Sequence, residues 1–163
     1  MDAETVVKTY SDMIYRIAMR YVAKPEDAED VYSEVFLNYF RRPREFESEE
    51  HRKAWLIKVT INCAKDLLGK RMNFEDIEEV QVADPKSGVS TEELIDLRKA
   101  LNELKEDYKE VICLFYLDDV PVKDIAVITG RPENTVKSML HRGREMLREK
   151  LEAADKAVKK ETN

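Results

Sequence analysis

The feature that most constrains the fold is the stretch of residues 120–150, VPVKDIAVITGRPENTVKSMLHRGREMLREK. Apolar side chains recur on one side of a short helix over residues 122–129, at Val122, Ile125, Ala126 and Ile128. Gly130 stands where this helix would end, because glycine readily adopts the positive φ of a sharp turn. Pro132 fits the first turn of a following helix, where its missing N–H costs nothing. The stretch therefore predicts two helices joined by a tight turn.

The second helix of this stretch has one apolar face and one polar, basic face. The apolar positions are Val136, Met139 or Leu140, Gly143 and Leu147, and the opposite face carries Lys137, Ser138, His141, Arg142, Arg144 and Arg148. Residues 131–150 contain six Lys or Arg and three Glu, a net charge of +3. Helix-turn-helix proteins that read DNA need such a projecting second helix. The alternative is a helical hairpin with a solvated charged face. It would explain the net positive charge but not the glycine and proline at the turn, so we favour DNA binding.

Individual roles follow from side-chain chemistry. Arg142 is best suited to read a base, since its guanidinium can bind guanine with two hydrogen bonds. Lys137 and Arg144 suit phosphates, and Ser138 and His141 suit either kind of contact. The side chains that we predict to contact duplex DNA are Arg131, Thr135, Lys137, Ser138, His141, Arg142 and Arg144.

Composition limits the remaining possibilities. The 163 residues include only 4 Gly and 5 Pro, and alternating strand patterns are nearly absent, so we expect an all-α chain of one domain or two small ones. The net charge of −6 means that any nucleic-acid surface must be local. Cys63 and Cys113 stand far apart at apolar helical positions and are interpreted as buried thiols. No membrane-spanning run or signal peptide is recognisable, which predicts a cytoplasmic protein.

Two one-faced helices are predicted in the N-terminal part. The first covers residues 4–22, with apolar side chains at Val6, Tyr10, Met13, Ile14, Ile17 and Tyr21. The second runs from Pro25 to about Pro43 and has a buried stripe of Ala28, Val31, Tyr32, Val35, Phe36 and Tyr39. Its outward face carries Glu29, Asp30, Ser33, Glu34 and Asn38. This acidic face fits either simple solvation or a docking surface for a basic partner.

A longer helix is predicted over residues 49–71, with Ser48 as its N-cap and an inner stripe of Leu56, Val59, Cys63 and Leu67. Residues 51–72 contain six Lys or Arg and one acid, net +5. Arg52, Lys53, Trp55, Lys58, Asn62 and Lys65 lie on its other faces. Cations, an aromatic ring and an amide together suit single-stranded DNA, whose phosphates and unstacked bases need such partners. A core position for Trp55 is the competing interpretation.

An acidic, Pro- and Gly-containing segment separates the two basic surfaces. Residues 73–90 lack helical periodicity and are predicted to be a linker. We therefore expect one domain over residues 1–72, a second over 91–152 and a frayed tail over 153–163. Helices from about Thr91 and over residues 108–116 are predicted to precede the helix-turn-helix.

Three motifs in this order resemble those of extracytoplasmic-function sigma factors, the minimal type of bacterial transcription initiation factor. DAEDVYSEVF at 27–36 is similar to the family's core-binding helix, usually DAEDLVQEVF. HRKAWLIKVTINCAKDLLGKR at 51–71 is similar to its promoter-melting helix. DVPVKDIAVITGRPENTVKSMLHRGREML is similar to its helix-turn-helix. The chain departs from the family pattern at Ser33 (usually Gln), Met139 (usually Arg) and Gly143 (usually Ala).

The resemblance implies a transcription initiation factor with no catalytic residues, cofactor or metal of its own. Core RNA polymerase would bind at Asp27, Asp30, Ser33 and Glu34. The melted −10 strand would bind at Arg52, Lys53, Trp55, Lys58, Asn62 and Lys65. The second domain would read the duplex −35 element, and an anti-sigma factor is the implied inhibitory partner. The alternatives are a helix-turn-helix repressor or activator that acts without polymerase, and a protein-interaction adaptor; neither gives the basic face at 52–71 a role.

Overall fold

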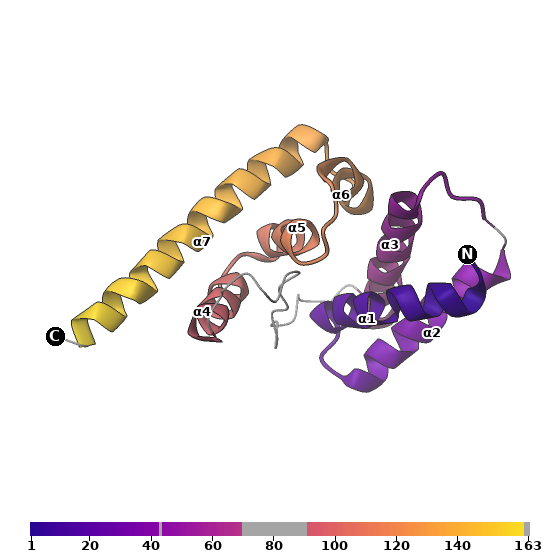
Figure 1. Cartoon of the computed structure of the whole chain (residues 1–163), viewed down its shortest axis with the longest axis horizontal. Helices are drawn as coiled ribbons and strands as arrows, with labels where there is room; N and C mark the ends of the chain where they lie inside the picture. The colour runs from indigo at the N-terminus through magenta and orange to yellow at the C-terminus, as the bar shows by residue number, and fades with distance from the viewer. Residues whose placement is uncertain (43, 70–90, 162–163) are drawn as a thin grey trace. The chain divides into compact units, whose positions relative to one another are not determined.

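The computed structural model describes residues 1–42, 44–69 and 91–161, and the chain divides into two compact units, Met1–Glu75 and Asp76–Asn163. The described residues form seven α-helices and no strand, which confirms the all-α prediction (Figure 1). The first unit holds α1 (Ala3–Tyr21), α2 (Pro25–Arg41) and α3 (Glu49–Leu68). The second holds α4 (Thr91–Asn102), α5 (Glu106–Tyr116), α6 (Val122–Thr129) and α7 (Glu133–Glu161). The predicted linker, residues 73–90, and residues 70–71 of the third predicted helix lie outside the described residues.

The three helices of the first unit each pack against the other two. α1 begins after Asp2, whose carboxylate accepts a hydrogen bond from the Thr5 N–H at 2.7 Å. α2 begins at Pro25 and α3 after Ser48, whose hydroxyl accepts the His51 N–H at 3.1 Å, both as predicted. These caps satisfy backbone donors that the first helical turn leaves without intrahelical partners.

The core of the first unit confirms two predicted stripes and corrects the third. All six predicted apolar residues of α1 are buried, and Ala28, Val31, Val35 and Phe36 of α2 are buried while Tyr32 and Tyr39 are half-buried. In α3 the buried residues are Leu56, Ile57, Thr60, Ile61 and Ala64. Val59 and Cys63 are only half-buried, and Leu67 is exposed. The predicted inner stripe of α3 was therefore wrong beyond Leu56. Apolar residues lie on more than one side of α3, and the side with Ile57 and Ile61 faces the other two helices.

The second unit is organised around α7, which packs against α4, α5 and α6. Figure 1 shows α7 as the longest helix of this unit, with the shorter α4, α5 and α6 along it. The fully or almost fully buried side chains include Leu101, Val111, Ile112, Leu114, Ile125, Val136 and Leu140. The helix-turn-helix is thus held by a core that extends over all four helices.

The turn between α6 and α7 forms as its residues predict. α6 covers Val122–Thr129, and Gly130 follows in the left-handed region with φ 70° and ψ 24°. The Arg131 N–H donates to the Ala126 carbonyl at 3.0 Å, which closes the turn. Pro132 immediately precedes the first residue of α7, and its carbonyl accepts the Val136 N–H at 3.0 Å, so it lies at the start of this helix as expected.

The end of α7 corrects a second expectation. The predicted frayed tail, residues 153–163, is helical as far as Glu161, and residues 162–163 lie outside the described part. The segment after Lys150 is rich in Ala, Glu and Lys, which are strong helix formers, and it continues a helix that has already been nucleated. Just before this segment, the Lys150 Nζ lies 3.2 Å from Glu103 Oε2, just beyond α4, and this ion pair joins α7 to the end of α4.

Candidate nucleic-acid interface

The polar face of α7 is exposed along its first three turns. Thr135, Lys137, Ser138, His141, Arg142 and Arg144 are all exposed, while Val136, Leu140, Gly143 and Leu147 are buried. Leu140 rather than Met139 fills the core position that the sequence left open. Two of the polar side chains have partners: Arg144 donates to the Tyr116 hydroxyl at 3.2 Å, and His141 Nε2 lies 3.2 Å from Glu145 Oε1. The face is therefore accessible to a ligand, and these contacts hold the side chains of Arg144 and His141 in place.

Gly143, where the family pattern has Ala, is explained by its neighbour. A Cβ at this position would lie 2.8 Å from both Cδ1 and Cγ1 of Ile112. Such distances are well inside van der Waals contact, so Ile112 already occupies the space that an alanine methyl would fill. Gly143 lets α7 pack closely against α5.

Arg131 lies in a different environment from the other predicted DNA contacts. Its side chain is 24% exposed and forms ion pairs with α5, at 3.1 Å to Asp107 Oδ1 and 3.6 Å to Glu110 Oε1. These pairs connect the turn before α7 to the N-terminal part of α5. The spacing of residues along the sequence could not have revealed them, because both carboxylates belong to a separate helix.

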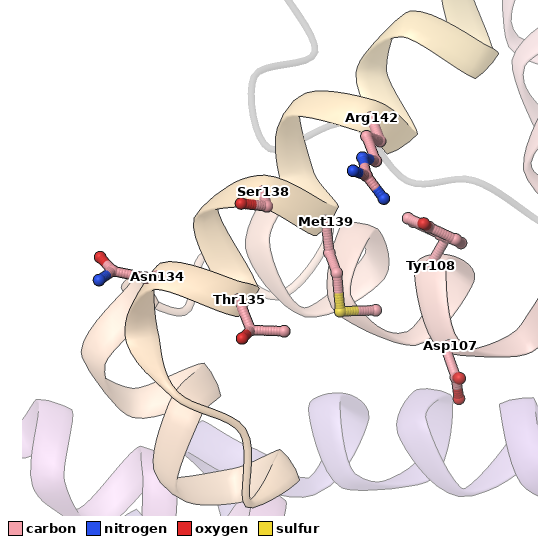
Figure 2. A pocket seen from close by; sticks show the side chains of 7 residues that line it. All are labelled: Asp107, Tyr108, Asn134, Thr135, Ser138, Met139 and Arg142. Atoms are coloured by element: carbon pink, nitrogen blue, oxygen red, sulfur yellow. The ribbon is translucent and has the colours of Figure 1, made fainter.

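An open hollow lies between the start of α5 and the exposed face of α7. It has a volume of about 410 Å³ and is lined by Asp107, Tyr108, Asn134, Thr135, Ser138, Met139 and Arg142 (Figure 2). Figure 2 shows the thioether of Met139 extending from α7 into this space, and Arg142 and Tyr108 facing each other across it. Sequence analysis identified Thr135, Ser138 and Arg142 but missed the other four. Of these four, only Met139 stood out in the sequence, because it replaces the arginine usual in the family pattern.

The basic face of α3 separates into exposed and packed residues. Lys58, Asn62 and Lys65 are exposed and follow one another at helical spacing. Trp55, one to two turns earlier, is half-buried. Its ring centroid lies 6.0 Å from that of Tyr39 and 6.0 Å from that of Phe46, and the Arg44 guanidinium lies over it at 4.6 Å. Trp55 is therefore both a packing residue and part of the surface.

Arg52 and Lys53 are less available than the sequence implied. Arg52 is half-buried, pairs with Glu49 and lies over the Phe46 ring at 5.1 Å. Lys53 is also half-buried. The exposed cations of this face that can meet a phosphate without rearrangement are Lys58 and Lys65.

The acidic face of α2 lies opposite its buried stripe. Asp30, Ser33 and Glu34 are exposed and Asp27 is half-buried. Leu37 continues the same helical side one turn later and is 49% exposed. An apolar side chain beside carboxylates gives this face the mixed chemistry of a protein-docking surface.

The two cysteines are free thiols, Cys113 buried and Cys63 half-buried, so the prediction of burial is fully met only at Cys113. Burial raises the pKa of the Cys63 thiol, with further contributions from Glu34 and Asp66, and the Asn38 amide donates to its sulfur at 3.8 Å. No group of three or more His, Cys, Asp or Glu in the described ranges is arranged to hold a metal ion. Among the helices described, none is both long and apolar enough to cross a membrane.

Comparison with known proteins places both units in one family. Residues 6–74 match the model for "Sigma-70 region 2", and residues 94–147 match the model for "Sigma-70, region 4". The ECF RNA polymerase sigma-E factor of Haemophilus influenzae is 31% identical over 90% of this chain and 86% of its own length. RNA polymerase sigma factor SigV of Bacillus subtilis is 29% identical over 93% of this chain and 92% of its own. The sigma factor RpoE of Bartonella quintana, solved in complex with the anti-sigma factor NepR, is 24% identical with a TM-score of 0.67, covering 91% of this chain and 96% of that one.

Proposed function

The chain belongs to the ECF RNA polymerase sigma factors, which direct transcription, and from this premise we propose which ligand each of its surfaces binds. The first unit docks on core RNA polymerase through Asp27, Asp30, Ser33 and Glu34 of α2. The same unit holds the melted −10 strand on α3, and the second unit reads the duplex −35 element with α7. The protein performs no covalent chemistry and acts in the cytoplasm.

One observation carries this proposal. Each of the two matched segments lies within one helical unit, and each unit exposes helix faces with the chemistry that the proposed ligands need. On α3, Asn62 lies between Lys58 and Lys65, so an amide for an unstacked base is flanked by two cations for phosphates. On α7, Arg142 lies beside Ser138, so a bidentate donor and a small hydroxyl can enter one major groove together.

Five further residues contribute to these DNA-binding surfaces, some by direct contact and some by supporting their neighbours. They are Arg52, Lys53, Trp55, Arg131 and Thr135. Trp55 offers an aromatic surface beside Lys58, and Thr135 is exposed at the start of α7. Arg52, Lys53 and Arg131 act mainly by holding their surfaces in place, since all three are half-buried and Arg52 and Arg131 are ion-paired within the protein.

A repressor or activator that works without polymerase is not favoured, because it leaves the faces of α2 and α3 without a ligand. We further propose that an anti-sigma factor restrains this chain; the structurally similar sigma factor of Bartonella quintana was solved in complex with an anti-sigma factor.

The direct test is run-off transcription with core RNA polymerase and promoter fragments. Wild-type protein should yield specific transcripts, and the double variant Asp30→Lys, Glu34→Lys should yield none and should not co-elute with core. Both residues are exposed, so the fold should survive the change. Asp12→Lys controls for charge reversal elsewhere in the same unit, because Asp12 is an exposed carboxylate on α1, and the single variants Asp30→Lys and Glu34→Lys match it in charge. Unchanged co-elution of the double variant would reject the α2 face as the docking surface.

A further inference from the structure

We propose that the hollow between α5 and α7 accepts the 5-methyl group of a thymine in the −35 element, with Met139 as the specificity-determining contact. This inference rests on the proposed reading of duplex DNA by α7. It assigns a role to a residue at which the chain departs from its family pattern.

The lining of the hollow has the chemistry that a thymine methyl requires. The thioether of Met139, the methyl of Thr135 and the ring of Tyr108 supply apolar surface around one open space (Figure 2). Thymine is the base that presents an apolar group, its C5-methyl, to the major groove, and proteins recognise it by apolar contact. Met139 cannot donate a hydrogen bond to a base edge, but its flexible, polarisable side chain adapts to a methyl group.

The placement of the hollow favours DNA as its occupant over an apolar peptide. It opens on the same face of α7 as Ser138 and Arg142, which are exposed and predicted to enter the groove. Its one carboxylate, Asp107, is ion-paired with Arg131 at 3.1 Å, which offsets the repulsion that Asp107 would exert on DNA phosphates.

The register of the contact follows from helix geometry. Met139 precedes Arg142 by three residues and so lies on the same side of α7, about 4.5 Å away along the axis. Consecutive base pairs in a duplex are about 3.4 Å apart. Met139 should therefore contact the base pair next to the one that Arg142 contacts.

The test replaces each thymine of the −35 element in turn by deoxyuridine, which removes only the methyl group. Holoenzyme affinity should fall about four-fold at one position, the value expected for one buried methyl, and that position should adjoin the one whose preference Arg142→Ala relaxes. In Met139→Ala the duplexes with thymine and uracil at that position should bind equally. Met139→Leu should keep the difference, because leucine retains an apolar side chain of similar size.

Three outcomes would overturn the inference: no position sensitive to uracil, a sensitive position that Met139→Ala leaves unchanged, or one that does not adjoin the Arg142 position. If the hollow instead takes a side chain of a protein partner, the scan will be flat and Met139→Ala will bind promoter normally. Thermal unfolding of each variant excludes loss of fold. Run-off transcription by the wild-type protein on the unmodified promoter distinguishes failure of the proposed function from failure of the Met139 contact. Absence of transcripts would reject the proposed function. Transcripts together with a flat scan would reject only the Met139 contact.

Discussion

Replacing Gly143 by Ala tests how tightly α7 is packed against α5. The new methyl would lie 2.8 Å from Cδ1 and Cγ1 of Ile112, a side chain that is only 1% exposed. Overfilling a packed core costs about 1–3 kcal/mol. Replacing a glycine inside a helix by alanine returns about 1 kcal/mol. The net change should therefore lie between zero and a loss of about 2 kcal/mol, although alanine is the better helix former.

The magnitude can be isolated with a double-mutant cycle. Ile112→Ala removes both crowded atoms and costs about 2–5 kcal/mol by itself. In that background Gly143→Ala has no steric penalty, so it should stabilise the second unit by about 1 kcal/mol. The coupling energy between the two positions should then be about 1–3 kcal/mol.

Urea unfolding of the full chain provides the measurement, in a fixed concentration of trimethylamine oxide so that the weakest variant keeps a folded baseline. The chain has one tryptophan, Trp55, so its fluorescence follows the first unit, while circular dichroism follows all helices. The Trp55 transition should not move, which serves as an internal control. Stabilisation by about 1 kcal/mol in the wild-type background would refute the reasoning, because Ile112 would then have moved aside without cost.

Three further predictions concern the proposed DNA surfaces. Asn62→Ala should impair open-complex formation far more than core binding, because the amide would meet only an unstacked base; permanganate footprints equal to wild type would contradict this. Arg142→Ala should cost about 1–3 kcal/mol at the correct promoter and relax preference at one base position, whereas Lys137→Ala should weaken all sequences alike and flatten the salt dependence. Equal losses across a panel of −35 substitutions would make Arg142 a backbone contact. Arg131→Gln should lower the stability of the second unit by up to about 1 kcal/mol, the range for ion pairs with an exposed partner such as Asp107, and leave the salt dependence of DNA binding unchanged; a lower salt slope would instead identify Arg131 as a phosphate contact.

The sequence was most informative where structure depends on local chemistry. The bounds of α6 and the left-handed Gly130 agree with prediction because a short apolar repeat and a glycine determine them within a few residues. The apolar face of α1 agrees because that helix shows a single clear stripe.

The sequence was less informative where packing between distant elements decides. The buried face of α3 was misjudged because apolar residues lie on more than one side of this helix, and only its packing against α1 and α2 selects the side with Ile57 and Ile61. The ion pairs of Arg131 and the hollow at Met139 both depend on α5, whose position against α7 no local pattern encodes. The helical tail was missed because charged residues without an obvious C-cap resemble a frayed end.

The continuity of α7 has a mechanical consequence for the second unit. A helix of 29 residues is about 43 Å long, and such a helix curves gently but kinks sharply only where its backbone hydrogen bonds are disturbed. α7 therefore moves largely as one element, with Arg142 nine residues after its first residue and Lys150, which pairs with Glu103, eight residues further on. A tilt of α7 against α4 would displace Arg142 with it. The direction in which α7 presents Arg142 is thus tied to the packing of α7 against α4.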